Sequence, residues 1–165
     1  MISKFFLVFF IIFVFALSGS IYANEELNLP STKINPGSFY YSYKRLWEKG
    51  IEKLQFSRQS KINFYQSQLK TKLAELNFVV ENKLLSEVQR SSERFAFQAG
   101  ILTDLLIKQR DEQKDGQTAR KTIEDFQKYN RFLEGLRDKY EANSSFWMLI
   151  QHDINSLSIL SERLK

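Results

Sequence analysis

Apolar residues that recur every three or four positions constrain the fold of this chain more than any other feature. The clearest run is Ile62, Tyr65, Leu69, Leu73, Leu76 and Val80. This spacing places one apolar side of an α-helix against a neighbour along its whole length. The alternating pattern that marks a half-buried strand does not occur in the sequence. The sequence therefore predicts an all-α protein.

Other segments repeat this periodicity. We expect helices over residues 39–54, from about Ser57 to Val80, through residues 88–106, and over a heptad-like segment at residues 118–164. Short polar turns at residues 81–83 and 109–116 favour antiparallel neighbours. The last segment fits either one continuous helix or a break at Asn143, and the preference of Asn and Ser for helix ends favours the break. The expected architecture is an antiparallel up-down bundle of three to four long helices preceded by a signal peptide.

The first residues have the pattern of an export signal. Lys4 precedes thirteen consecutive apolar residues, 5–17, and small residues suitable for cleavage follow, ending at Ala23. Thirteen helical residues cover roughly 20 Å, less than the hydrocarbon core of about 30 Å, which favours a cleaved signal over an uncleaved anchor extending to Ala23. We expect a signal peptide at residues 1–23, a linker and turn at 24–37, and one extracytoplasmic helical domain, periplasmic or secreted, at 38–165.

Charge is unevenly distributed along the predicted domain. Residues 44–72 hold eight basic and two acidic residues, a net charge of +6, whereas residues 73–165 hold fourteen basic and fifteen acidic residues. The sequence contains no cysteine, so packing without disulfides must hold the domain together. The positive charge at the front of the domain favours contact with an anionic partner.

The stretch NPGSFYYSYKRLWEKG, residues 35–50, combines aromatic and basic side chains. Helical spacing assigns Phe39, Tyr43, Leu46 and Trp47 to a stripe that we expect to be buried. Tyrosine beside lysine and arginine suits a membrane interface. The candidate contact residues for a partner protein or an anionic membrane surface lie mainly beside that stripe: Tyr40, Tyr41, Lys44, Arg45 and Lys49.

Catalytic and metal-binding motifs are missing from the sequence. The only histidine, His152, and the acid with the most apolar flanks, Asp104, are both expected on solvated helix faces. We expect no metal and no cofactor. Nucleic acid is not an expected partner, because the chain is exported and shows no nucleic-acid-reading motif. Gly100 is expected to let two helices approach closely.

Two stretches, PGSFYYSYKRLWEK and LQFSRQSKINFYQSQLKTKLAEL, resemble the start of a family of exported bacterial proteins named domain of unknown function 5667. In that family a proline turn and aromatic residues precede a lysine-rich helix, and a long helix follows that ends in an RLAE-like segment. Lys72 stands here where arginine is commoner. The resemblance is best over residues 36–75 and weaker over 91–106. It implies an extracytoplasmic helical domain without an assigned activity, and it transfers no functional residues.

These observations predict a non-catalytic helical interaction module of the cell envelope. It would bind a partner protein or a membrane surface through a basic face of its first two helices. The alternative is a structural or oligomerising envelope protein, a homo-oligomer in which the heptads at residues 126–164 pair between chains. An enzyme is a remote third alternative.

Overall fold

The computed structural model describes residues 27–113 and 116–165, and every regular element in that part of the chain is an α-helix. The helices are α2 (Tyr41–Lys53), α3 (Arg58–Glu81), α4 (Leu85–Gln113), α5 (Gln117–Arg137) and α6 (Ser145–Leu164). The prediction of an all-α protein is confirmed. The predicted signal peptide, residues 1–23, lies outside the described residues.

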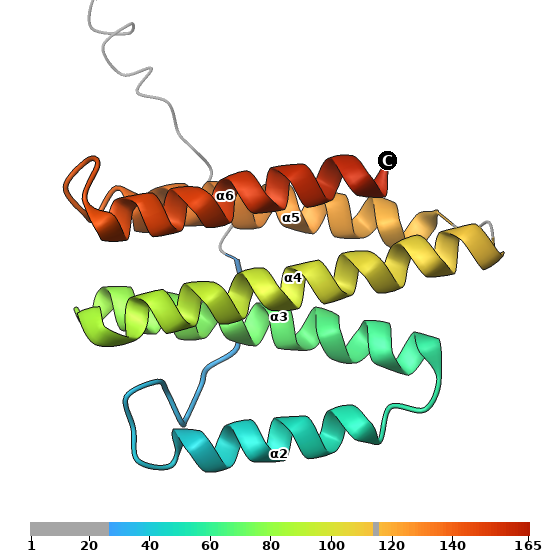
Figure 1. Ribbon diagram of the computed structural model, residues 1–165, viewed down its shortest axis with the longest axis horizontal. Coiled ribbons are helices and arrows are strands. Elements are labelled where there is room, and N and C mark those ends of the chain that lie inside the picture. The colour runs from blue at the N-terminus through green and yellow to red at the C-terminus, as the bar shows by residue number, and fades with distance from the viewer. Residues whose placement is uncertain (1–26, 114–115) are drawn as a thin grey trace, which may run out of the picture.

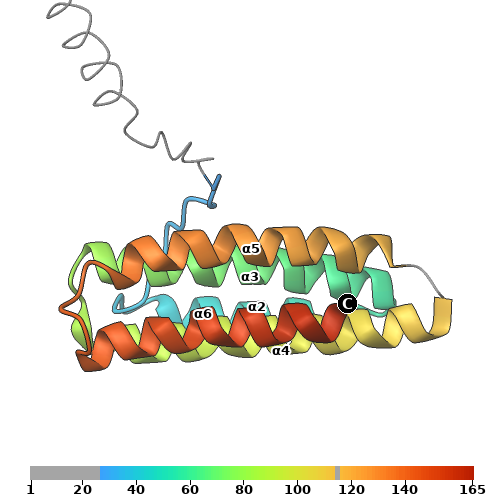
Figure 2. The same cartoon turned by 90° about the horizontal axis from the view of Figure 1, so that it is seen from above.

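The helices are stacked in layers (Figure 1). Helices α5 and α6 form one layer, α3 and α4 form the next, and α2 lies on the far side of α3 and α4. Seen from above, α5 lies over α3 and α6 lies over α4 (Figure 2). Consecutive helices run in opposite directions. We call α3, α4, α5 and α6 together the helical body.

The core of the helical body is built from the apolar stripes that the sequence predicts. The fully or almost fully buried members are Ile62, Leu69, Leu73 and Leu76 of α3, Phe95, Ala99, Leu102 and Leu106 of α4, Phe126 and Leu133 of α5, and Ile150 and Leu157 of α6. The predicted burial of these stripes is confirmed. Most of the heptad residues of α5 and α6 pack inside their own chain, whereas Tyr140 and Trp147 are partly exposed.

The helix ends follow local chemistry. Ser57 caps α3 and Ser144 caps α6, each accepting a hydrogen bond from the backbone N–H three residues later. Helix α5 ends at Arg137 and α6 begins at Ser145, so the break predicted near Asn143 is confirmed. Asn143, in the connection between them, has a positive φ of 64°. After α3 the left-handed residue is Lys83, with φ of 54°.

Two features differ from the predicted organisation. Leu27 and Leu29 are half-buried and pack against the core, so part of the predicted linker at residues 24–37 lies on the helical body. A Cβ atom added at Gly100 would meet no other side chain or neighbouring backbone within 4 Å. The predicted close approach of two helices at Gly100 is therefore wrong.

Candidate functional site

Helix α2 turns its apolar side away from the helical body, opposite to the prediction. We call this side the α2 outer face, and it consists of Phe39, Tyr40, Tyr43, Leu46, Trp47, Leu54 and Phe56. Their relative exposures range from 64% to 88%. The predicted burial of Phe39, Tyr43, Leu46 and Trp47 is wrong, because the face of α2 that packs inward is polar.

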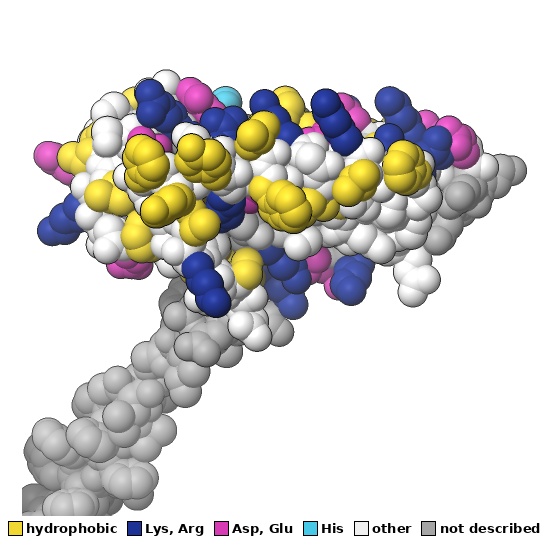
Figure 3. All heavy atoms as spheres, turned by 90° about the horizontal axis from the view of Figure 1, so that it is seen from below, with side chains coloured by type: hydrophobic (Ala, Val, Ile, Leu, Met, Phe, Trp, Pro, Cys, Tyr) yellow, Lys and Arg dark blue, Asp and Glu magenta, His cyan; other side chains and the backbone are white. Residues whose placement is uncertain are grey.

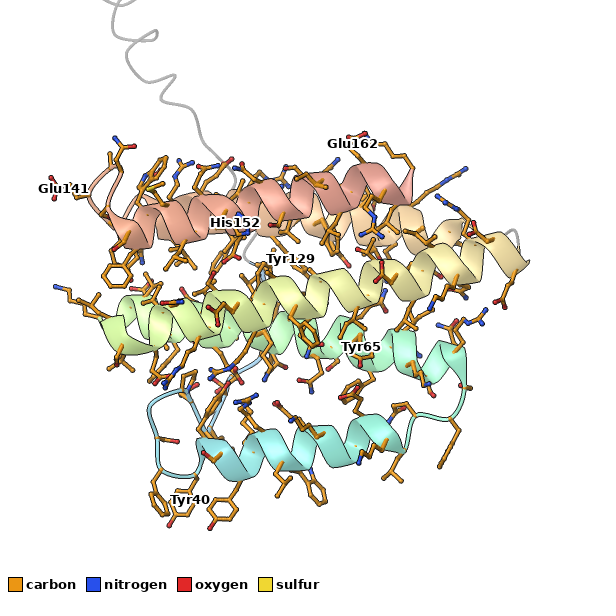
Figure 4. All side chains as sticks on the ribbon, viewed as in Figure 1. Tyr40, Tyr65, Tyr129, Glu141, His152 and Glu162 are labelled. Carbon is orange, nitrogen blue, oxygen red and sulfur yellow. The ribbon has the colours of Figure 1, made fainter. Side chains whose placement is uncertain are left out.

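The α2 outer face is a concentrated patch. Among the described residues, twelve large hydrophobic side chains are exposed, and seven of them belong to this face. Figure 3 shows hydrophobic side chains gathered on the side of the molecule that α2 covers, with lysine and arginine side chains around them. Tyr40 points away from the helical body (Figure 4). Clustering of this kind on one face marks an interaction surface, whereas scattered exposed apolar residues would not.

A polar network beneath α2 holds the helix in this orientation. At its centre is Glu75 of α3, which is 1% exposed. Its Oε1 atom accepts hydrogen bonds from Lys44 Nζ at 2.6 Å and from Lys72 Nζ at 3.2 Å. Its Oε2 atom accepts a hydrogen bond from the hydroxyl group of Tyr41. Lys72 also donates to Glu48 of α2 at 2.8 Å, so the buried charges are paired across the two helices.

Two tyrosine hydroxyl groups extend the network. Arg94 of α4 donates to the Tyr41 hydroxyl oxygen at 3.3 Å, and its guanidinium carbon lies 5.0 Å from the centre of the Tyr41 ring. Tyr65 points from α3 toward α2 (Figure 4) and donates to Glu52 at 2.5 Å. Burial, together with the neighbouring carboxylate of Glu75 or Glu52, raises the pKa of both tyrosines. Both hydroxyl groups therefore remain donors at physiological pH.

The network explains why the apolar side of α2 faces outward. The backbone of α2 stands off from α3 and α4, and long polar side chains fill the space between them (Figure 4). Turning the apolar side inward would take away the α2 partners Lys44 and Glu48 and leave the buried Glu75 and Lys72 paired only with each other. Breaking a buried ion pair typically costs about 3–5 kcal/mol. That penalty opposes the gain from burying the rings of the outer face.

The sequence contained a signal for this arrangement that apolar periodicity alone does not detect. Tyr41, Lys44, Glu48 and Glu52 recur with the same helical spacing as the apolar stripe. On α3, Lys72 and Glu75 lie on one helix face as an i, i+3 pair. The α3 pair is buried, and its ion-pair partners on α2, Lys44 and Glu48, are largely covered, with 17% and 15% of their side chains exposed.

The structure separates the predicted contact residues into two groups. Tyr41 is 6% exposed and the Lys44 side chain is 17% exposed, and both are engaged inside the protein. These two residues are therefore removed from the contact surface. Tyr40, Arg45 and Lys49 are exposed, with Tyr40 on the outer face.

Basic residues border the outer face along one edge. Lys49 and Lys53 are exposed and one helical turn apart, and neither has an ion-pair partner in residues 27–113 or 116–165. Arg45 is a further turn back along the same side of α2 and is likewise exposed. Lys53 was not among the predicted contact residues. The site is thus an aromatic and apolar face with a cationic edge.

A second unusual group, Asp153 of α6, lies in the interior of the helical body. It is 1% exposed, and neither carboxylate oxygen has a hydrogen bond of ordinary geometry in the described part of the chain. Burial raises the pKa of Asp153 to about 7, and the Ser92 hydroxyl opposes this shift. Asp153 was not among the residues singled out from the sequence. Its neighbour His152 is exposed, as predicted, and Asp104 is exposed and paired with Arg163.

Comparison with known proteins returns no match. No protein-family model matches the chain, and neither a curated protein nor a solved structure is similar to it. The resemblance to domain of unknown function 5667 therefore stays a prediction. None of the helices in the described part of the chain has the length and apolar character needed to cross a bilayer.

Proposed function

We propose that this protein is a non-catalytic module of the cell envelope that binds an anionic membrane surface through the α2 outer face. The observation that carries the proposal is the orientation of α2. This helix packs through a buried network of charges and presents its aromatic side to solvent. In this proposal residues 1–23 export the chain, and α3 to α6 serve as the up-down bundle that supports α2.

The composition of the outer face favours a lipid interface. Phe39, Tyr40, Tyr43, Trp47 and Phe56 contribute aromatic rings, and aromatic rings sit well at the depth of lipid headgroups. Full burial of one large apolar side chain contributes about 1.5–3 kcal/mol. Half of that burial for the seven residues of the outer face amounts to roughly 5–10 kcal/mol before ordering costs.

The cationic edge favours anionic lipids. Lys49 and Lys53 lie beside the apolar face of α2. If that face were inserted into a membrane, their long aliphatic side chains would let the ammonium groups reach the lipid phosphates. A basic residue close to an anionic leaflet contributes on the order of 1 kcal/mol. Charge complementarity therefore supports a membrane as the partner.

The orientation of α2 also distinguishes this proposal from the oligomer alternative. Most heptad residues of α5 and α6 are buried within the chain, whereas seven of the twelve exposed large hydrophobic side chains in the described residues lie on the α2 outer face. A partner protein that binds the outer face remains an outcome of the experiment below.

Trp47 provides a direct probe of membrane insertion. The sequence has two tryptophans, and Trp147→Phe leaves Trp47 as the only fluorophore of its kind in the full chain. The full chain would be incubated with vesicles of anionic or zwitterionic lipid brominated at defined acyl positions. We expect quenching and a blue shift of Trp47 emission with anionic vesicles. Because the readout is local, it reports on α2 even if residues 1–23 anchor the chain.

Matched variants test the two parts of the face. Leu46→Ser with Leu54→Ser should abolish the quenching, and Lys49→Glu with Lys53→Glu should weaken it for anionic vesicles only. The control is Ile159→Ser, which removes an equally exposed apolar side chain of α6 and should change nothing. If brominated lipids quench Trp47 emission in neither anionic nor zwitterionic vesicles, membrane binding through α2 is excluded. A protein partner would then be the remaining function of the outer face.

A further inference from the structure

We propose that a cavity between α2 and α4 binds the phosphodiester group of an anionic lipid, through the guanidinium groups of Arg45, Arg90 and Arg94. The inference rests on the proposed function, because the membrane is the source of the lipid. It adds a defined headgroup site to the apolar face.

The cavity lies at the N-terminal end of α2 and has a volume of about 550 Å³. Its walls come from the turn at Gly37 and Ser38, from the first turn of α2, and from the N-terminal half of α4. Gly37 has a positive φ of 87°, and the Ser38 N–H donates to the Asn35 carbonyl oxygen at 3.2 Å. This turn forms part of the cavity wall beside α2 and α4.

The three arginines retain donors for a ligand. Arg45 is exposed and has no ion-pair partner within the described ranges. Arg90 has a single long contact, 3.4 Å from its Nη1 atom to Glu87 Oε1, and 68% of its side chain is exposed. Arg94 is fixed by Tyr41, which uses only part of its guanidinium group. The planar guanidinium fork matches the paired oxygens of a phosphate group better than an ammonium group does.

The charge of the lining selects the ligand class. Glu87 and Glu93 also line the cavity, so three arginines face two glutamates and the net charge is +1. That balance suits a singly charged phosphodiester, as in phosphatidylglycerol, better than a phosphomonoester with nearly two charges. Glu93 accepts a hydrogen bond from Gln89 at 2.9 Å but has no cation partner in the described part of the chain. Removing its charge should strengthen binding of the anion.

The cavity and the outer face both include residues of α2, so one lipid surface can contact both. Arg45 lies on the same side of α2 as Lys49 and Lys53, the cationic edge of the outer face. An interfacial helix buries its apolar side only about 5–10 Å into the boundary, which keeps its flanks at the headgroup level. Arg45, on one of these flanks, is also a lining residue of the cavity.

The test is calorimetric titration of the full chain in dodecyl maltoside micelles. One arm adds glycerophosphoglycerol, the soluble headgroup, and the other adds phosphatidylglycerol dissolved in the same micelles. We expect Arg45→Gln and Arg90→Gln each to weaken binding about tenfold. Glu93→Gln should strengthen binding severalfold. The control Arg131→Gln removes the same charge from an exposed position on α5 and should leave the affinity within about twofold.

Arginine-dependent binding in both arms supports the site and shows that the headgroup suffices. Arginine-dependent binding of the lipid alone also supports the site and shows that acyl chains contribute. The proposal is overturned if neither arm shows binding. It is also overturned if the affinity is the same for Arg45→Gln, Arg90→Gln and Arg131→Gln. Leu46→Ser with Leu54→Ser should not change the soluble arm. Failure of the outer face in the Trp47 experiment is therefore distinguishable from failure of this cavity.

Discussion

Replacing Asp153 by asparagine is expected to stabilise the protein near neutral pH and to leave its stability near pH 4 almost unchanged. The carboxyl group is 1% exposed and lacks a hydrogen bond of ordinary geometry in the described residues. Burial raises its pKa from the ordinary value of 3.8 to about 7. The folded state therefore holds a proton on Asp153 over a pH range in which the unfolded chain has released it.

The sign of the effect follows from proton linkage. Between about pH 4 and pH 7 the folded state binds more protons at Asp153 than the unfolded state, so the free energy of unfolding falls as pH rises. At pH values above about 7, the pKa of Asp153 in the folded state, the free energy of unfolding has lost the whole contribution of this proton. A shift of about three pKa units at about 1.4 kcal/mol each gives a loss of roughly 4 kcal/mol. Asparagine has nearly the same shape and does not ionise, so the variant lacks this loss.

Urea unfolding followed by circular dichroism, repeated from about pH 4.5 to pH 8.5, measures the effect. The difference in unfolding free energy between Asp153→Asn and the natural chain should grow toward roughly 4 kcal/mol as pH rises. Taking a difference between two chains cancels the titration of the other carboxyl groups. Asp104→Asn is the control, because Asp104 is exposed and its ion pair with Arg163 should contribute less than about 1 kcal/mol. A difference for Asp153→Asn that is the same at both ends of the range would refute the reasoning.

Three further predictions test other parts of the structure, and a fourth substitution, Glu81→Ala, is the control for the first of them. Glu75→Ala removes the acceptor at the centre of the network beneath α2 and should cost about 3 kcal/mol, with faster hydrogen exchange confined to α2. Glu81→Ala, which breaks an exposed ion pair, should cost less than about 1 kcal/mol in the same assay. Gly100→Ala should raise the free energy of unfolding by about 0.5–1 kcal/mol, because a Cβ at that helical position meets no neighbour, and a lower urea midpoint would contradict this. Ser144→Ala should lower it by about 1 kcal/mol through loss of the α6 cap, and an unchanged midpoint would show that the cap contributes nothing.

The helical body follows largely from local sequence. Residues spaced three or four positions apart lie on one side of a helix, independently of what the helix packs against. The apolar stripes from Ile62 to Val80 and from Val88 to Leu106 therefore predict both the helices and the core. The break at Asn143 is also local, because Asn tolerates the left-handed conformation and Ser144 caps the helix that follows.

The orientation of α2 and the burial of Asp153 were decided only by the tertiary structure. Helix α2 has an apolar stripe and a charged stripe of equal periodicity, and the sequence of one helix does not specify which of them meets the rest of the protein. Glu75 and Lys72 on α3 favour the charged stripe. Facing the apolar stripe, these two buried charges would keep only each other and would lose their hydrogen-bond partners on α2. The site therefore depends on complementarity between segments distant in sequence, which periodicity within one segment does not contain.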